Sequence, residues 1–209
     1  MKILIADDHP LVRQGLKQVL DAQSDLAVVA EAKDGDDLIS QAGRVAWDVA
    51  VIDYNMPGKA GVELVKELRR RYPGRPVLVL SMYPEDRYAL RLLKAGAAGY
   101  LNKESAPEEL VGALHKVAGG GRYVSAALGE KLALAMAGDG EEPAYEKLSD
   151  REYQIMWLLA SGKTVGDIAR QLFLSANTVS TYRARILKKL NVKNNAELMR
   201  YAIRHQLID

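Results

Sequence analysis

The sequence of 209 residues contains no cysteine. The chain therefore cannot form disulfides, thiolate zinc sites, iron–sulfur clusters or a cysteine nucleophile. It also lacks any apolar run approaching the roughly 20 residues that span a bilayer. Its first residues, MKILIADDH, turn acidic before the apolar core of a signal peptide develops. We expect a protein of the reducing cytoplasm that is neither secreted nor inserted in a membrane.

Several catalytic signatures are missing as well. The chain has no Walker A loop, no G-x-G-x-x-G fingerprint and no G-x-S-x-G elbow, so nucleotide hydrolases, dinucleotide enzymes and serine hydrolases are not indicated. Its three histidines, His9, His115 and His205, lack the spacing of metal ligands. We expect His9, which follows an acidic pair, to be a surface or supporting residue rather than a ligand.

The charge is distributed unevenly along the chain. Residues 1–145 carry 18 Lys and Arg against 21 Asp and Glu, whereas residues 146–209 carry 11 against 6. An acidic front joined to a basic tail points to nucleic-acid binding at the tail, although a solvated surface gives the same excess. Residues 138–147 are rich in Gly, Pro and acidic residues, and we expect a linker there.

Before that linker, short apolar runs alternate with amphipathic segments. Strict alternation of continuous apolar strands with helices predicts a doubly wound (βα)5 parallel sheet covered on both faces. The predicted helices span about residues 11–22, 35–44, 61–71, 85–95 and 107–118. The predicted strands are Ile3–Ala6, Ala27–Ala30, Val49–Ile52, Val77–Leu80 and Ala97–Leu101.

Polar side chains stand at the carboxyl ends of four of these strands, where ligands bind in such folds. They are Asp7 with Asp8, Asp53, Ser81 and Lys103. Converging carboxylates repel one another unless a cation compensates, and oxygen ligands of this kind suit Mg²⁺. Lys103 and Ser81 suit the oxygens of a transferring phosphoryl group, which makes Asp53 the candidate nucleophile. The alternative for any single aspartate is helix capping or solvation of the rim.

Residues 1–120 resemble the receiver domain of two-component response regulators, which is flavodoxin-like. The resemblance rests on Asp7-Asp8, the stretch Asp53–Gly58, Ser81, the segment Ala95–Leu101 and Lys103. It implies that Asp53 accepts phosphate from a sensor histidine kinase. It implies Mg²⁺ held by Asp8, Asp53 and the Asn55 backbone carbonyl, with Asp7 nearby. It also implies that Ser81 and Tyr100 form a switch pair, although a half-buried strand aromatic would equally explain Tyr100. In relatives, the positions of Asn55 and Tyr83 tune the phosphoryl lifetime.

The basic tail predicts four helices with recognisable starts. Ser149 and Glu152 form an S-x-x-E capping box, Gly162 ends the first helix, and Thr164 and Ser175 cap the second and third. The third helix, about residues 176–190, places apolar residues on one face and small polar or basic ones on the other. Such a pair of helices suits insertion into the major groove, although a small helical bundle with a solvated face is the alternative.

Residues 148–209 resemble the LuxR-type helix-turn-helix domain of the NarL/FixJ regulators, and residues 121–147 are then a connector, partly helical over 123–137. The matching residues are Leu148, Ser149, Arg151, Glu152, Gly162–Thr164, Ile168, Ala169, Leu174, Ser175, Thr178, Val179, Tyr182, Ile186, Lys189 and Leu190. The resemblance implies that Ser180, Thr181 and Ala184 face base edges and that Thr178, Arg183, Arg185 and Lys188 meet phosphates or flanking bases. Met199 and Ile203 are the candidate contacts of a DNA-bound homodimer.

These patterns favour a phosphorylation-controlled transcription regulator that binds promoter DNA and turns over no external substrate. Three alternatives remain open. A signalling module acting only through protein contacts would keep the Asp53 chemistry without DNA affinity. A small Mg²⁺-dependent hydrolase on the same sheet would leave the tail unexplained. A regulator that binds DNA without needing phosphate would use the DNA-binding tail without depending on phosphorylation of Asp53.

Overall fold

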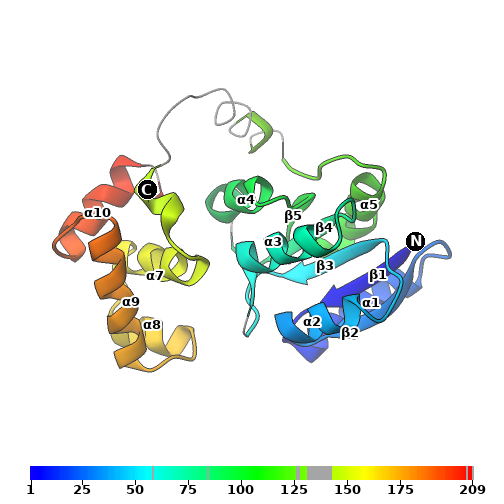
Figure 1. Ribbon diagram of the computed structural model, residues 1–209, viewed down its shortest axis with the longest axis horizontal. Helices are drawn as coiled ribbons and strands as arrows, with labels where there is room; N and C mark the ends of the chain where they lie inside the picture. The colour runs from blue at the N-terminus through cyan, green and yellow to red at the C-terminus, as the bar shows by residue number, and fades with distance from the viewer. Residues whose placement is uncertain (58, 84, 126–127, 131–142, 206, 209) are drawn as a thin grey trace. The chain divides into compact units, whose positions relative to one another are not determined.

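Five parallel strands form the centre of the first part of the chain in a computed structural model of the protein (Figure 1). The structure describes residues 1–57, 59–83, 85–125, 128–130, 143–205 and 207–208. Two compact units, residues 1–138 and 139–209, divide the chain. The finer boundaries expected at residues 120 and 147 remain predictions. No helix in the described part of the chain is long and apolar enough to span a bilayer.

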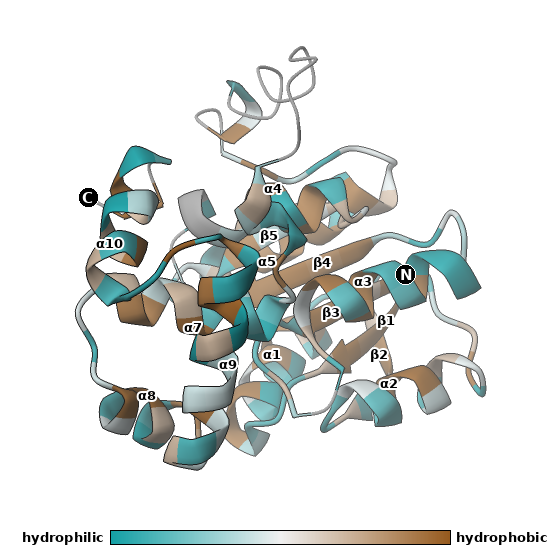
Figure 2. Ribbon diagram, turned by 60° about the vertical axis from the view of Figure 1, so that its left-hand side comes forward, coloured by the Kyte–Doolittle hydropathy of each residue, from teal (hydrophilic) through white to brown (hydrophobic). Residues whose placement is uncertain are grey.

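The sheet has the strand order β2-β1-β3-β4-β5, and every neighbouring pair is parallel. Each strand starts and ends within two residues of its predicted apolar run, so the predicted (βα)5 fold is confirmed. The strands are β1 (Lys2–Ala6), β2 (Ala27–Ala32), β3 (Val49–Asp53), β4 (Val77–Ser81) and β5 (Gly99–Asn102). All residues of β3 and β4 are buried, as continuous apolar strands in a covered sheet should be (Figure 2).

Helices cover both faces of this sheet. Buried side chains of α1 and α5 join one cluster with alternate residues of β1, β3 and β4, so these two helices share a face. Helices α3 and α4 contact each other on the other face. The helices are α1 (Pro10–Asp21), α2 (Gly35–Ala42), α3 (Gly61–Arg71), α4 (Glu85–Lys94) and α5 (Ala106–Ala118).

The second unit is helical, and its helices begin where the caps predict. Ser149 and Glu152 form a reciprocal capping box, Thr164 caps the next helix with Asp167, and Ser175 accepts from the Thr178 N–H. The elements are the 3-10 helix η1 (Ala144–Lys147), α7 (Asp150–Ala160), α8 (Val165–Gln171), α9 (Ala176–Lys189) and α10 (Asn195–Arg204). Their core includes Ile155, Ile168, Val179, Ile186 and Leu198, all fully buried.

The connector is described at residues 121–125, 128–130 and 143–147. The partly helical segment expected over 123–137 and the linker expected over 138–147 fall largely on residues 126–127 and 131–142, which lie outside the described residues. At the first end, Tyr123 forms an isolated parallel bridge with Gly99 of β5. At the second end, Tyr145 of η1 packs edge-on against His205 after α10, with ring centroids 5.5 Å apart. Each end is therefore anchored on its own unit.

Candidate functional site

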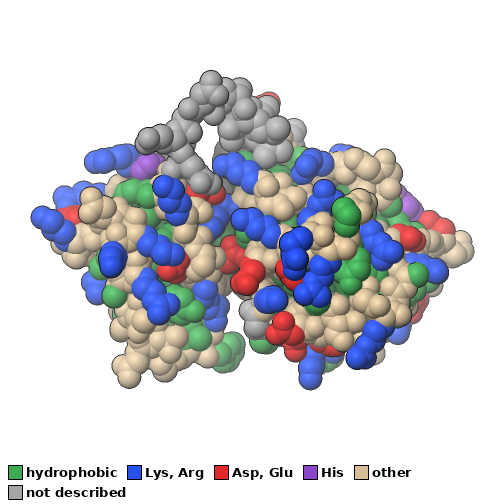
Figure 3. Space-filling view, viewed as in Figure 1, with side chains coloured by type: hydrophobic (Ala, Val, Ile, Leu, Met, Phe, Trp, Pro, Cys, Tyr) green, Lys and Arg blue, Asp and Glu red, His purple; other side chains and the backbone are tan. Residues whose placement is uncertain are grey.

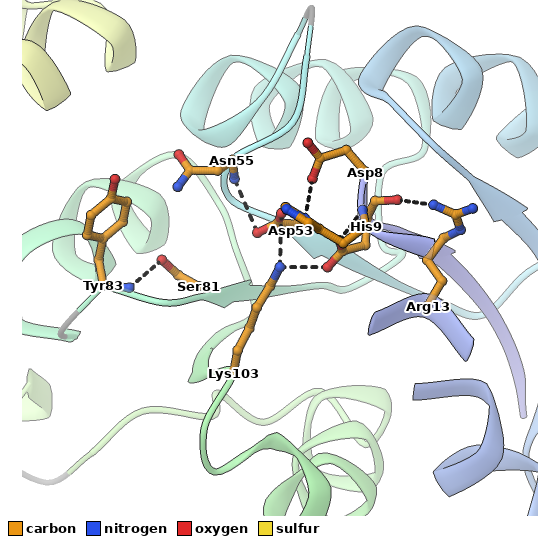
Figure 4. Close-up of polar contacts among 9 residues, drawn as sticks. Asp8, His9, Arg13, Asp53, Asn55, Ser81, Tyr83 and Lys103 are labelled. Atoms are coloured by element: carbon orange, nitrogen blue, oxygen red, sulfur yellow. Dashed lines mark hydrogen bonds and ion pairs between the residues drawn. The ribbon is translucent and has the colours of Figure 1, made fainter. Parts of the chain in front are cut away.

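Three of the four predicted strand ends bring charged groups together at one edge of the sheet (Figure 4). The Lys103 ammonium nitrogen lies 2.6 Å from Asp7 Oδ2 and 3.0 Å from Asp53 Oδ2. Asp7 and Asp53 are buried, since they follow or end central strands of a covered sheet. Lys103 therefore balances two buried carboxylates that would otherwise repel each other.

Asp8 and His9 complete the cluster. One ligand atom from each of Asp7, Asp8, His9 and Asp53 lies within 4.8 Å of the others. The ring Nδ1 of His9 lies 2.8 Å from Asp8 Oδ1 and 3.3 Å from Asp7 Oδ1, although two thirds of its side chain is exposed. Arg13, which the sequence reasoning missed, donates from its guanidinium to the Asp7 carbonyl at 2.6 Å. Its position one turn into α1 was the available signal.

The surroundings of Asp53 and Lys103 change their acidity. Burial raises the pKa of the Asp53 carboxyl to about 6; the Lys103 charge opposes this shift and the Asp7 charge reinforces it. Burial alone would lower the pKa of the Lys103 ammonium, but its ion pairs with Asp53 and Asp7 outweigh that effect and raise it. The ammonium is thus a fixed positive charge at neutral pH.

The residues present fit a hard divalent cation. Asp8 Oδ1 and Asp53 Oδ2 are buried, and one nitrogen lies close to each of them, His9 Nδ1 at 2.8 Å and Lys103 Nζ at 3.0 Å. Each carboxylate oxygen has two lone pairs, so both keep capacity to coordinate a cation. Three carboxylates dominate the donor set, which is the chemistry that Mg²⁺ prefers. Asn55 lies in the loop directly after β3, where its N–H donates to Asp53 Oδ1 at 3.2 Å.

The predicted switch residues meet through the backbone of a third residue. Ser81 Oγ accepts from the Tyr83 N–H at 3.1 Å, and the Tyr100 hydroxyl donates to the Tyr83 carbonyl at 2.7 Å. Tyr100 is buried, with only 2% of its surface exposed, rather than half-buried as a strand aromatic at the rim would be. Figure 4 shows Tyr83 beside Ser81 in the loop after β4.

In the second unit, the predicted DNA-contacting residues lie on α9. Five of the seven side chains are exposed: Ser180, Thr181, Ala184, Arg185 and Lys188. Thr178 and Arg183 are partly buried, and Arg183 Nε donates to Asn195 Oδ1 at 2.7 Å. Lys and Arg side chains are frequent on the surface formed by α9 and α10 (Figure 3). Arg185 and Lys188 are therefore better placed for a partner than Arg183.

The candidate dimer contacts lie on α10. Met199 and Ile203 are 38% and 51% exposed, whereas Leu198 and Ala202 on the same helix are buried against the core. Residues four apart lie on one helix face, so Met199 and Ile203 form a small exposed apolar strip.

Comparisons with known proteins match both units. Residues 3–115 match the response regulator receiver domain, and residues 146–202 match the bacterial regulatory proteins of the luxR family. The response regulator UvrY of Escherichia coli K12 is 36% identical over 208 residues, covering 99% of this chain and 95% of the relative. The response regulator GacA of Pseudomonas aeruginosa is 38% identical over 210 residues, covering 100% and 98%.

Solved structures agree. RcsB from Salmonella enterica serovar Typhimurium, bound to promoter rprA in the presence of the phosphomimetic BeF3⁻, matches with a TM-score of 0.63 and 30% identity, covering 96% of this chain and 97% of that one. A structure of two RcsB dimers bound to two parallel DNAs matches with a TM-score of 0.60 and 28% identity, covering 100% and 99%. The chain therefore belongs to the NarL/FixJ family of two-component response regulators, with a receiver domain followed by a LuxR-type DNA-binding domain.

Proposed function

We propose that Asp53 accepts a phosphoryl group from the phosphohistidine of a sensor histidine kinase. The observation that carries the proposal is the placement of the Lys103 ammonium 2.6 Å from Asp7 Oδ2 and 3.0 Å from Asp53 Oδ2, between two buried carboxylates. A buried cation beside a buried nucleophile suits a transferring phosphoryl group, because the group brings its own negative charge.

The step balances as a simple transfer. An Asp53 carboxylate oxygen attacks phosphorus, the phosphorus–nitrogen bond of the phosphohistidine breaks, and the electron pair and a proton end on the kinase imidazole. Lys103 neutralises charge on the phosphoryl oxygens. Mg²⁺, held by Asp8, Asp53 and the Asn55 backbone carbonyl with Asp7 nearby, would neutralise the same oxygens when bound.

The charge of the phosphoryl group on Asp53 would rearrange Ser81 and Tyr100 and, through them, change dimerisation and DNA binding. Ser81 turns its hydroxyl from the Tyr83 N–H toward a phosphoryl oxygen, and the β4–α4 loop and Tyr100 repack around it. We propose that this change favours homodimers, which contact each other through Met199 and Ile203 on DNA. In this proposal α9 enters the major groove of promoter DNA, with the protein acting in the cytoplasm and turning over no external substrate.

Two of the matched structures support the proposed DNA binding and dimerisation. RcsB has been captured on promoter DNA with a phosphomimetic, and as dimers on DNA. In the present chain the surfaces that suit DNA and a second copy are the exposed polar face of α9 and the exposed strip on α10. Phosphate-contacting cations on α9 would supply affinity, and its small polar residues would supply sequence preference.

The intact mass of the full chain tests the first step. Wild type and Asp53→Ala are incubated with Mg²⁺ and a small-molecule phosphodonor, and we expect one phosphoryl adduct on wild type alone. DNA titrations on both forms then measure the effect on promoter affinity. An absent adduct under all conditions would contradict the phosphoacceptor role and favour a regulator that binds DNA without phosphate.

A further inference from the structure

The chain that follows α5 turns back onto the free edge of β5. The Tyr123 N–H donates to the Ala98 carbonyl at 3.0 Å, and the Tyr123 carbonyl accepts from the Tyr100 N–H at 3.0 Å. Gly99 permits this approach, because a Cβ atom there would lie 2.8 Å from the Tyr123 carbonyl oxygen. The first residues of the connector therefore extend the sheet by one short, parallel pairing.

We call residues 122–125 the strap, because its contacts reach several neighbouring elements. The ring of Tyr123 packs against the core cluster of the receiver. The additional hydrogen bonds run from the Arg122 guanidinium to the Ala97 carbonyl at 3.0 Å, from the Tyr123 hydroxyl to the Glu109 carboxylate of α5, and from the Ser125 N–H to Glu85 Oε1 of α4 at 2.9 Å. The strap thus joins α4, β5 and α5.

These contacts continue the hydrogen bonds of the switch without a gap. Ser81 Oγ is bonded to the Tyr83 N–H, the Tyr83 carbonyl to the Tyr100 hydroxyl, and the Tyr100 N–H to the Tyr123 carbonyl. Each link is a direct bond of 2.7 to 3.1 Å. A contiguous network of this kind can carry a local change to a distant element if its members have two arrangements.

We propose that Tyr123 is a positioning residue of the receiver switch, acting through Tyr100 to pass the state of Asp53 to the connector. This inference rests on the proposed phosphorylation of Asp53. When Ser81 leaves the Tyr83 N–H for a phosphoryl oxygen, the Tyr83 carbonyl shifts, Tyr100 repacks, and the strap follows because Tyr100 holds its backbone. Glu85 adds a second path, because it joins the start of α4 to Ser125.

The test measures coupling separately from phosphorylation. For full-length wild type, Tyr123→Ala and Tyr123→Phe, the phosphoryl adduct formed with Mg²⁺ and a small-molecule phosphodonor is followed by intact mass, and the affinity for one duplex is measured with and without that adduct. Tyr123→Ala keeps the backbone bonds but removes the ring that packs the strap on the core cluster. We expect this variant to take up phosphate at the wild-type rate, while the ratio of its two affinities falls at least fivefold toward one. Tyr123→Phe keeps the ring and should keep most of the ratio.

Glu108→Ala is the matched control, since Glu108 is an exposed glutamate beside Glu109 on α5. It should retain the wild-type ratio. A Tyr123→Ala protein with a normal adduct and a wild-type ratio would overturn the coupling and leave the phosphoacceptor role intact. A wild-type chain that takes up no phosphate would overturn the proposed function and the coupling together.

Hydrogen exchange gives a readout that does not depend on DNA. The phosphodonor with Mg²⁺ should change the exchange of residues 122–125 in wild type, because their backbone bonds to Ala98 and Glu85 rearrange. The same treatment should leave the exchange of these residues unchanged in Asp53→Ala. Identical exchange of the strap in phosphorylated and unphosphorylated wild type would refute the inference, whatever the variants do in DNA binding.

Discussion

The Lys103 ammonium lies 3.0 Å from Asp53 Oδ2, and yet the pKa of the Asp53 carboxyl stays raised to about 6. Burial therefore outweighs the ion pair. A carboxyl whose pKa is raised on folding binds more protons in the folded state, so its charge lowers stability as the pH rises from about 4 to 6, and the loss stays constant above that window. The rise of the Asp53 pKa from 3.8 to about 6 corresponds to about 2–3 kcal/mol of lost folding stability.

We predict that, with a chelator present to remove divalent metal, Asp53→Asn raises the free energy of unfolding of the receiver by about 2 kcal/mol at pH 7.5. At pH 4.5 the increase should be much smaller. Calorimetry of the full chain at the two pH values measures the difference between variant and wild type, so other titrating groups cancel. Adding Mg²⁺ should stabilise wild type and narrow the gap. A gap that does not depend on pH would contradict the burial of a charged Asp53.

Lys189 stabilises the DNA-binding domain through a buried carboxylate. Its ammonium donates to Glu152 Oε2 at 2.6 Å, and the Ser149 N–H donates to the same oxygen at 2.8 Å. Burial would raise the pKa of Glu152, but these bonds outweigh it and the pKa is lowered. The resulting stability is present above pH 4.5, the ordinary value for Glu, and is lost as the pH falls through the lowered pKa.

Lys189→Ala should therefore destabilise this domain by about 1–2 kcal/mol at pH 7 and by less at pH 3.5. Urea unfolding followed by circular dichroism gives both values. Lys188→Ala replaces the neighbouring, exposed lysine and should change stability by less than about 0.5 kcal/mol. Equal losses of stability from the two substitutions would show that the ion pair between Lys189 and Glu152 does not stabilise the domain.

Arg183 and Arg185 should behave differently, although both carry a charge on α9. Arg185 is exposed, and its replacement by Ala should weaken DNA binding by about 1–3 kcal/mol without changing stability. Arg183 donates to Asn195, so Arg183→Ala should also loosen the start of α10 and lower the melting temperature.

Titrations of Arg185→Ala on matched and mismatched sites, at several salt concentrations, identify the kind of contact. A phosphate contact predicts uniform weakening and a salt slope reduced by about one, whereas a base contact predicts lost discrimination between sites. No change in either quantity would remove Arg185 from the interface.

The strip formed by Met199 and Ile203 gives a prediction about assembly. Met199→Asp places a charge in a surface that must become dry on dimerisation, so we expect monomeric complexes where wild type forms dimers on DNA. Analytical ultracentrifugation of the full chain with a duplex of two half-sites measures this. Arg200→Ala on the same helix is the control. Dimeric complexes of Met199→Asp would show that α10 is not the contact.

Much of the receiver site could be predicted from sequence, because the geometry of a parallel sheet does most of the placement. Once the apolar runs are taken as parallel strands, Asp7, Asp53 and Ser81 must end at one edge, and Lys103 follows the last strand to the same edge. The helix starts at Ser149 and Thr164 were equally predictable, since a capping box is a local pattern of four residues.

The contacts that escaped prediction are of two kinds. Tyr83 meets Ser81 and Tyr100 through its backbone, which leaves no trace in residue type. The bond from Arg183 to Asn195 depends on how α9 and α10 cross, and the bridge of Tyr123 to Gly99 depends on where an irregular segment lands. Neither has the periodicity by which strands and helices are detected.

The pairing of Tyr123 with Gly99 also covers part of a sheet edge that could otherwise pair with a strand of another molecule. The last strand of an open sheet exposes unpaired N–H and carbonyl groups that can template a strand from another molecule. Here the backbone of Tyr123 pairs with two groups at this edge, the carbonyl of Ala98 just before β5 and the N–H of Tyr100 within it. The missing side chain of Gly99 permits this approach. A receiver cut after residue 120 would lose this cover, and its newly opened edge would favour aggregation.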